Sequence, residues 1–157
     1  MKKVFSVMLA LTVGIMFCFA GAGLALEKAT KDECVAKAKA AAELARKSGL
    51  DAALEKIGDK NGPFVWKDSY VFCIDLKQAT VLAHPIKPKL RGKKLIGIKD
   101  SNGKMFFVEM VNTAKNQGQG WVSYMWPRPG EKKPSAKVTY IYRIPGVDAA
   151  MCAGVYE

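Results

Sequence analysis

Between residues 31 and 48, where apolar and polar residues are mixed, the apolar positions recur with the period of a helix. Those that share one face are Val35, Ala38, Ala42 and Ala45. Thr30 and Glu33 have the spacing of a capping box, and Gly49 is a natural C-terminal stop. The pattern therefore predicts a long first helix over 31–48 and a short second helix over 50–57.

After residue 64 the pattern changes to the β-branched and aromatic content of strands. Five strands are predicted, over residues 69–75, 80–84, 120–126, 136–144 and 149–156. A proline-punctuated loop and a helix over 104–116 separate the second strand from the third. Strands joined mostly by hairpins, with helices in between, predict an α+β fold with an antiparallel sheet covered on one side.

Residues 1–25 have the pattern of a signal peptide. Two lysines precede an uncharged run, and Gly23 and Ala25 stand at the −3 and −1 positions of a signal-peptidase site. Cleavage there predicts a single exported domain over 26–157, periplasmic or extracellular. The alternative is a retained membrane anchor, because the uncharged run could just span a bilayer.

The charge balance narrows the choice of partners. The chain has 25 Lys and Arg against 14 Asp and Glu, a net charge of +11. Basic residues gather between 87 and 104, where most form a solvated face that attracts anions. Export argues against nucleic acid as the partner, and membrane contact is expected only if residues 1–25 stay uncleaved.

Little in the sequence indicates catalysis. His84 is the only histidine, which excludes sites that need two. There is no Cys-x-x-Cys pair, no phosphate-binding glycine loop and no nucleophile turn. We therefore expect no enzyme, no metal site and no cofactor.

Several segments together resemble a known family. They are Ser-Tyr-Val-Phe-Cys-Ile-Asp at 69–75, Val-Leu-Ala-His-Pro-Ile-Lys-Pro at 81–88, Gly-Trp-Val-Ser-Tyr-Met-Trp-Pro at 120–127 and Ala-Gly-Val-Tyr at 153–156. Over about 30–157 the chain is similar to a single Cache domain of type 2, an extracytoplasmic small-molecule sensor. The resemblance implies a PAS-like five-stranded antiparallel sheet with a long N-terminal helix. The family's receptors carry a signalling module, and because the sequence stops at Glu157 we expect none here.

The resemblance also implies a pocket between the sheet and the connection after the second strand. His84 and Lys87 lie on that connection and offer an N–H donor and a positive charge. The expected aromatic wall consists of Trp121, Tyr124, Trp126, Tyr140 and Tyr142. Such a site suits a short carboxylate, whereas the alternative explanation is an ordinary loop histidine, a solvated lysine and core aromatics.

Three cysteines remain after cleavage, so at most one internal disulfide can form. In PAS-like folds the first and last strands are neighbours, which favours Cys73–Cys152. Cys34 on the first helix is the competing partner.

We thus expect an exported ligand-binding Cache domain without its own signalling module. Its ligand would be a small organic acid of the acetate, propionate, pyruvate or lactate class, and its partner a separate membrane receptor. The alternative is a basic exported adaptor that binds a protein partner and no small molecule.

Overall fold

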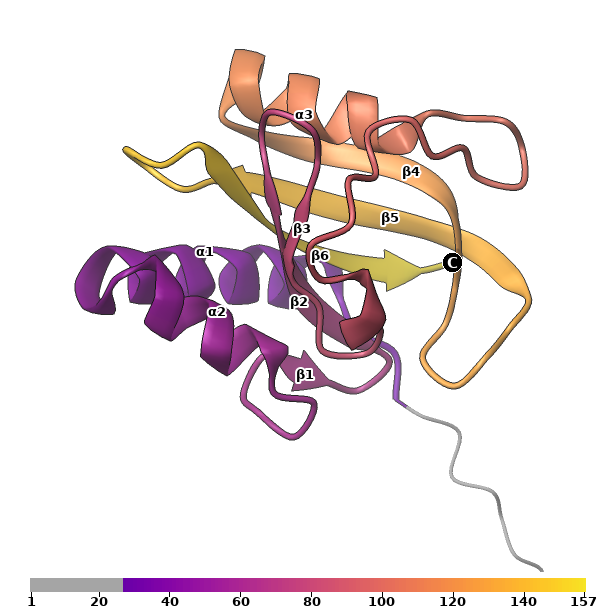
Figure 1. Ribbon diagram of the computed structural model, residues 1–157. Coiled ribbons are helices and arrows are strands. Elements are labelled where there is room, and N and C mark those ends of the chain that lie inside the picture. The colour runs from indigo at the N-terminus through magenta and orange to yellow at the C-terminus, as the bar shows by residue number, and fades with distance from the viewer. Residues whose placement is uncertain (1–26) are drawn as a thin grey trace, which may run out of the picture.

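The computed structural model describes residues 27–157, and its helices lie on both faces of a central antiparallel sheet (Figure 1). The predicted signal peptide lies outside the described residues and stays a prediction. The elements in chain order are α1 (Lys31–Ser48), α2 (Leu50–Gly58), β1 (Val65–Trp66), β2 (Ser69–Asp75), β3 (Val81–Ala83), the 3-10 helix η1 (Pro88–Leu90), α3 (Phe106–Gln117), β4 (Gln119–Pro127), β5 (Pro134–Arg143) and β6 (Ala149–Tyr156).

The predicted α+β class and antiparallel sheet are confirmed. The strand order is β1-β2-β6-β5-β4, with β3 also paired to β2. The two-residue strand β1 was not predicted, because Val65 and Trp66 are too short a run to show a period. The capping box is confirmed, since Thr30 Oγ1 accepts from the Glu33 amide while the Glu33 carboxylate accepts from the Thr30 amide.

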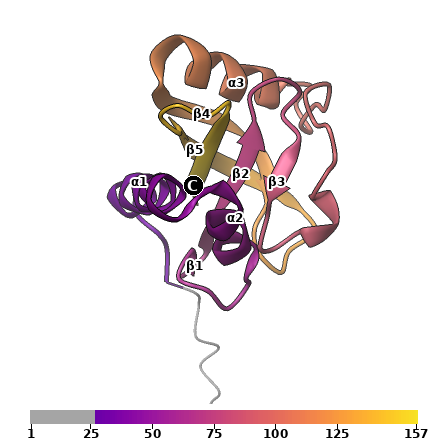
Figure 2. The same ribbon diagram turned by 60° about the vertical axis from the view of Figure 1, so that its left-hand side comes forward.

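The expectation that helices cover only one side of the sheet is wrong. α1 and α2 pack on one face, and α3 with the 84–105 segment covers the other (Figures 1 and 2). We call the first the helix face; it carries Val71, Cys73, Tyr140, Met151 and Ala153. We call the second the pocket face; it carries Tyr70, Phe72, Tyr124, Ile141 and Cys152.

This division overturns the predicted disulfide. Cys73 lies opposite Met151 and Phe72 lies opposite Cys152 across the β2–β6 ladder. Residues directly opposite share a face, so the side chains of Cys73 and Cys152 point to opposite sides of the sheet. Both thiols are free and buried, as is that of Cys34.

The loop before α3 closes the outer edge of the sheet. The carboxylate of Asp100 accepts from the backbone amides of Asn102 and Lys104, and its other oxygen accepts from the Met125 amide at 2.9 Å. The turn predicted at 100–103 is therefore fastened to edge strand β4. Because α3 starts soon afterwards, this attachment helps to fix where Phe106 meets the sheet.

Candidate ligand-binding site

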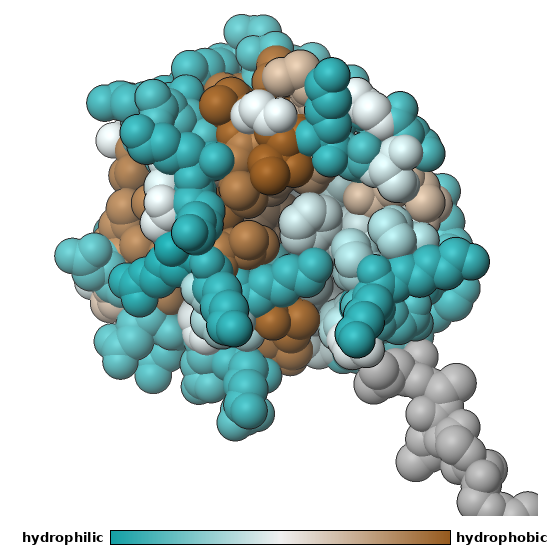
Figure 3. Space-filling model, turned by 45° about the vertical axis from the view of Figure 1, so that its right-hand side comes forward, coloured by the Kyte–Doolittle hydropathy of each residue, from teal (hydrophilic) through white to brown (hydrophobic). Residues whose placement is uncertain are grey.

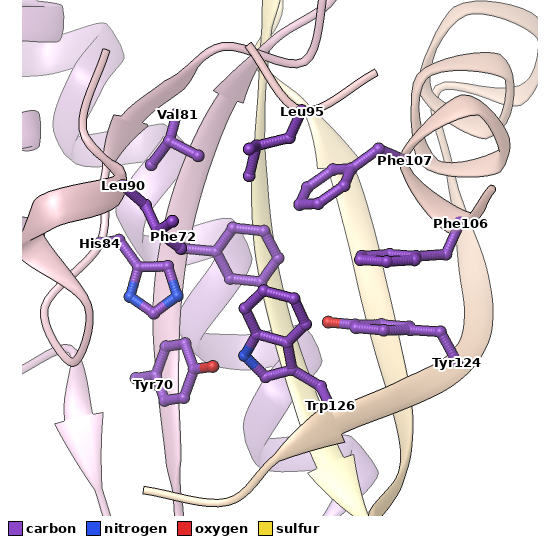
Figure 4. A pocket seen from close by; sticks show the side chains of 10 residues that line it. All are labelled: Tyr70, Phe72, Val81, His84, Leu90, Leu95, Phe106, Phe107, Tyr124 and Trp126. Carbon is purple, nitrogen blue, oxygen red and sulfur yellow. The ribbon is translucent and has the colours of Figure 1, made fainter. Parts of the chain in front are cut away.

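A small cavity lies on the pocket face between the sheet, α3 and the segment that follows β3. It is lined by Tyr70, Phe72, Val81, His84, Leu90, Leu95, Phe106, Phe107, Tyr124 and Trp126 (Figure 4). The volume open to the centre of a water molecule is about 10 Å³. That is about the room that one water needs, so these side chains would have to move apart to admit an organic ligand. On the face drawn in Figure 3, apolar surface lies in a hollow with hydrophilic side chains around it.

Rigid aromatic rings form most of the wall. Phe106 of α3 stacks on Tyr124 of β4, with ring centroids 4.2 Å apart and planes 3° from parallel. The hydroxyl of Tyr124 is hydrogen-bonded to Thr139 Oγ1 at 3.0 Å. In Figure 4 the hydroxyls of Tyr70 and Tyr124 both point toward Trp126, in the middle of the group. The wall is therefore apolar with a few polar tips, as ligand pockets usually are.

His84 directly follows β3 and is buried against Tyr70 and Phe72, with ring centroids 4.8 and 5.6 Å away. Its Nδ1 accepts from the Lys87 amide at 3.1 Å. Burial first, and then the charges of Lys137 and Lys87, lower the pKa of His84 to about 3. The ring is therefore neutral at pH 7 with its proton on Nε2, which leaves one N–H donor for a ligand.

Lys87 lies at the rim of the cavity. Its Nζ is 4.3 Å from the centroid of the Trp126 ring, a cation–π contact. Burial is the main cause that lowers the pKa of Lys87, and the nearby Lys137 adds to it. The structure thus brings four of the predicted residues together, namely His84, Lys87, Tyr124 and Trp126.

The other three predicted wall residues lie on the helix face. Tyr140 faces Trp121 across the β4–β5 ladder at a ring distance of 5.2 Å, and Tyr142 lies beside Tyr140 at 6.4 Å. Lys31 and Lys39 of α1 place their amines over Trp121 and Tyr142. The expectation that these aromatics join the same wall is wrong, because their strand positions point away from the cavity.

The sequence reasoning missed a lysine that is fully buried on the pocket face. Lys137 of β5 has no exposed surface, and its Nζ lies 4.1 Å from the Tyr70 ring centroid and 4.7 Å from that of Tyr156. Within residues 27–157 this amine has no hydrogen-bond partner. The available signal was strand alternation, which puts residue 137 on the same side of β5 as Thr139 and Ile141.

Comparison with known proteins identifies the family. A family model described as "Cache domain" matches residues 34–157. The chain belongs to the Cache domain family. This confirms the resemblance seen in the sequence.

Relatives of this Cache domain include a chemoreceptor and sensor domains. A segment of 89 residues is 38% identical to the methyl-accepting chemotaxis protein McpP of Pseudomonas putida; it is 57% of this chain and 16% of that protein. Among solved structures, the "Periplasmic sensor domain of chemotaxis protein" is 27% identical with a TM-score of 0.65, over 80% of this chain and 88% of the other. One titled "Structural basis for carboxylic acid recognition by a Cache chemosensory domain" is 29% identical with a TM-score of 0.64, over 80% and 86%.

No group of three or more His, Cys, Asp or Glu side chains in 27–157 is arranged to hold a metal ion. In that same range no helix is both long enough and apolar enough to cross a bilayer.

Proposed function

We propose that this Cache domain binds a short-chain carboxylate in the aromatic cavity, with Lys137 as its counter-ion. The observation that carries the proposal is the Lys137 amine, which is buried without a hydrogen-bond partner among the described residues. A buried ammonium is costly unless it is paired. Three aromatic faces offset part of that cost, but a ligand carboxylate would offset more.

The neutral His84 supports the same ligand. Its Nε2–H can donate to a carboxylate oxygen, while Nδ1 is already occupied by the Lys87 amide. A carboxylate held between the Lys137 ammonium and this N–H gains two charge-assisted hydrogen bonds in a region shielded from water. The Trp126 ring and the Phe106–Tyr124 stack would then cover a short apolar tail.

The relatives indicate the setting in which such binding is used. One solved Cache domain is described by its recognition of carboxylic acids, and the matched segment of McpP belongs to a chemotaxis receptor. We extend the proposal to an exported sensor of acetate, propionate, pyruvate or lactate whose occupied state is read by a separate membrane receptor. The basic residues of the 87–104 segment would raise the local concentration of such anions.

Calorimetric titration tests the proposal with matched acids and amides. Propionate should bind wild-type protein, and Lys137→Met should weaken it about 30-fold or more, the equivalent of about 2 kcal/mol for a buried charge pair. Propionamide has nearly the same shape without the charge and should bind weakly to both proteins. Lys89→Met removes an exposed lysine and should leave the affinity for propionate within twofold.

Two outcomes would contradict the proposal. If wild-type protein and Lys137→Met bind acetate, propionate, pyruvate and lactate with equal affinities, Lys137 is not part of the site. If none of the four acids binds, the alternative function is favoured, namely a basic adaptor that binds a protein partner. That partner should then dissociate at high salt.

A further inference from the structure

Gly154 of β6 occupies the point on the pocket face where the Lys137 side chain crosses the sheet. β6 lies between β5, which carries Lys137, and β2, which carries Tyr70. Gly154 pairs with Thr139, so a side chain at position 154 would project on the pocket face. The Lys137 amine nevertheless lies over the Tyr70 ring, on the far side of β6.

A single added methyl group would block this path. A Cβ built at Gly154 would lie 2.8 Å from Lys137 Cε, 2.8 Å from the backbone oxygen of Val138 and closer still to Thr139 Oγ1. Carbon atoms in optimal contact are about 3.5–4.0 Å apart, so both side chains would have to move. Thr139 is also held by the Tyr124 hydroxyl, and turning its Oγ1 away would break that bond.

The φ angle of Gly154 gives no reason for glycine here. Six glycines of the described chain have a positive φ, and Gly154 is not among them. A glycine inside a strand weakens the strand unless something approaches its backbone closely. At Gly154 the groups that approach are the Lys137 and Thr139 side chains and the Val138 carbonyl.

We propose that Gly154 is a positioning residue that admits the Lys137 amine to the ligand cavity and thereby sets the preference for anions. The inference rests on the proposed function, because it assigns Gly154 an effect only through Lys137. A residue with a Cβ at 154 displaces the amine, and in the aromatic wall it disturbs the Thr139–Tyr124 hydrogen bond. Such a cavity would keep its apolar surface and lose its charge selectivity.

The test compares the affinities for propionate and propionamide in Gly154→Ala. Propionate should bind at least tenfold more weakly, whereas the affinity for propionamide should change by less than threefold. Gly58→Ala is the matched control, because a Cβ at Gly58 meets nothing within 4 Å. The selective loss should persist when Gly154→Ala is placed in a Thr139→Ala chain, where the lysine and the Val138 carbonyl are left in the way.

A double-mutant cycle separates this role from simple packing. In a Lys137→Ala chain the lysine no longer lies against position 154, although Thr139 and the Val138 carbonyl still do. Adding Gly154→Ala there should change the affinity for propionate by a smaller factor than in the wild-type chain. The fall in melting temperature that Gly154→Ala causes should likewise shrink in the Lys137→Ala chain. This thermal readout applies even if Gly154→Ala alone is too unstable to titrate.

The outcomes distinguish this inference from the proposed function. If Lys137→Ala weakens propionate binding but Gly154→Ala does not, the inference is wrong and the proposed function stands. Equal losses for acid and amide, or additive losses in the cycle, would also overturn it in favour of a packing role. If Lys137→Ala leaves propionate binding unchanged, the proposed function and the inference both fall.

Discussion

On the helix face, α1 presents small side chains to the sheet, whereas on the pocket face α3 presents large aromatic ones. α1 places Ala38, Ala41 and Ala42 against the strands, all of them at most 2% exposed. Small residues let a helix backbone approach a sheet closely and fill the space at high density. On the pocket face, rigid rings such as the stacked pair Phe106 and Tyr124 line a cavity. The proposed binding site thus lies on the face where the covering helix supplies large, stiff side chains.

The two faces also differ in the polar atoms they leave unsatisfied. Within the described residues two buried side-chain atoms have no hydrogen-bond partner, Trp66 Nε1 beside the helix-face core and Lys137 Nζ on the pocket face. A neutral N–H left unpaired costs roughly 1–3 kcal/mol, whereas an isolated charge costs far more. The pocket face therefore holds an energetic cost that an anionic ligand can relieve.

The largest expected difference between the two faces is in how one substitution on each changes the free energy of unfolding. Ile57→Ala removes a fully buried side chain of the helix-face core and should lower the free energy of unfolding by about 2–5 kcal/mol. Lys137→Met replaces a buried unpaired ammonium by an apolar chain of similar length and should raise it by about 1–4 kcal/mol. Urea denaturation without ligand measures both. A loss of stability in Lys137→Met would mean that its aromatic contacts outweigh the cost of the buried charge.

Lowering the pH should destabilise the folded protein through His84 on the pocket face. Its pKa is lowered to about 3 in the folded protein, from an ordinary value of about 6.5 when unfolded. Between these values only the unfolded chain takes up the proton, so stability is full above pH 6.5 and falls as the pH decreases toward 3. Between pH 7.5 and 5 this amounts to a loss of about 2 kcal/mol.

Denaturation over pH 5–7.5 in a buffer free of carboxylic acids measures this slope. The basic groups that lower the pKa of His84 are Lys137 and Lys87, and its ring packs on Tyr70 and Phe72. Because His84 is the only histidine, a His84→Gln chain should show little slope over the same range. An equal slope in both chains would assign the pH dependence to other groups.

Local rules in the sequence were enough for most of the fold. The capping box at Thr30, the turn at 100–103 and strand alternation after residue 64 each depend on neighbouring residues, and the elements they predict are present. The disulfide failed because it depends on register between strands distant in sequence. A difference of one residue puts Cys73 and Cys152 on opposite faces.

The aromatic wall failed for a related reason. Tyr124 and Trp126 share one side of β4, but Trp121 is an odd number of residues away and so must face the other side. For Tyr140 alternation alone could not decide, because the face follows from its pairing with Trp121. Lys137 was overlooked because it follows a lysine-rich linker, where a further lysine is expected to be solvated. In the folded chain its side chain has no exposed surface, and its amine contacts the Tyr70 ring.

The smallest expected effect compares two tryptophans of the same strand. Trp126 lines the cavity beneath the Lys87 amine, whereas Trp121 is 38% exposed on the helix face beside Tyr140. Trp126→Ala should weaken propionate binding at least fivefold by removing apolar wall. Trp121→Ala should leave that affinity within twofold and change the free energy of unfolding by less than about 1 kcal/mol, as partly exposed sites usually do.

Titration of both variants under the same conditions makes the two faces directly comparable, because the chemical change is identical. The distance along β4 is only five residues, so a ligand that contacted both rings would have to pass through the sheet. A loss of affinity in Trp121→Ala comparable to that in Trp126→Ala would place ligand on the helix face, where Lys39 and Tyr142 border an open groove. The aromatic cavity would then be part of the core, and Lys137 would lack a role in binding.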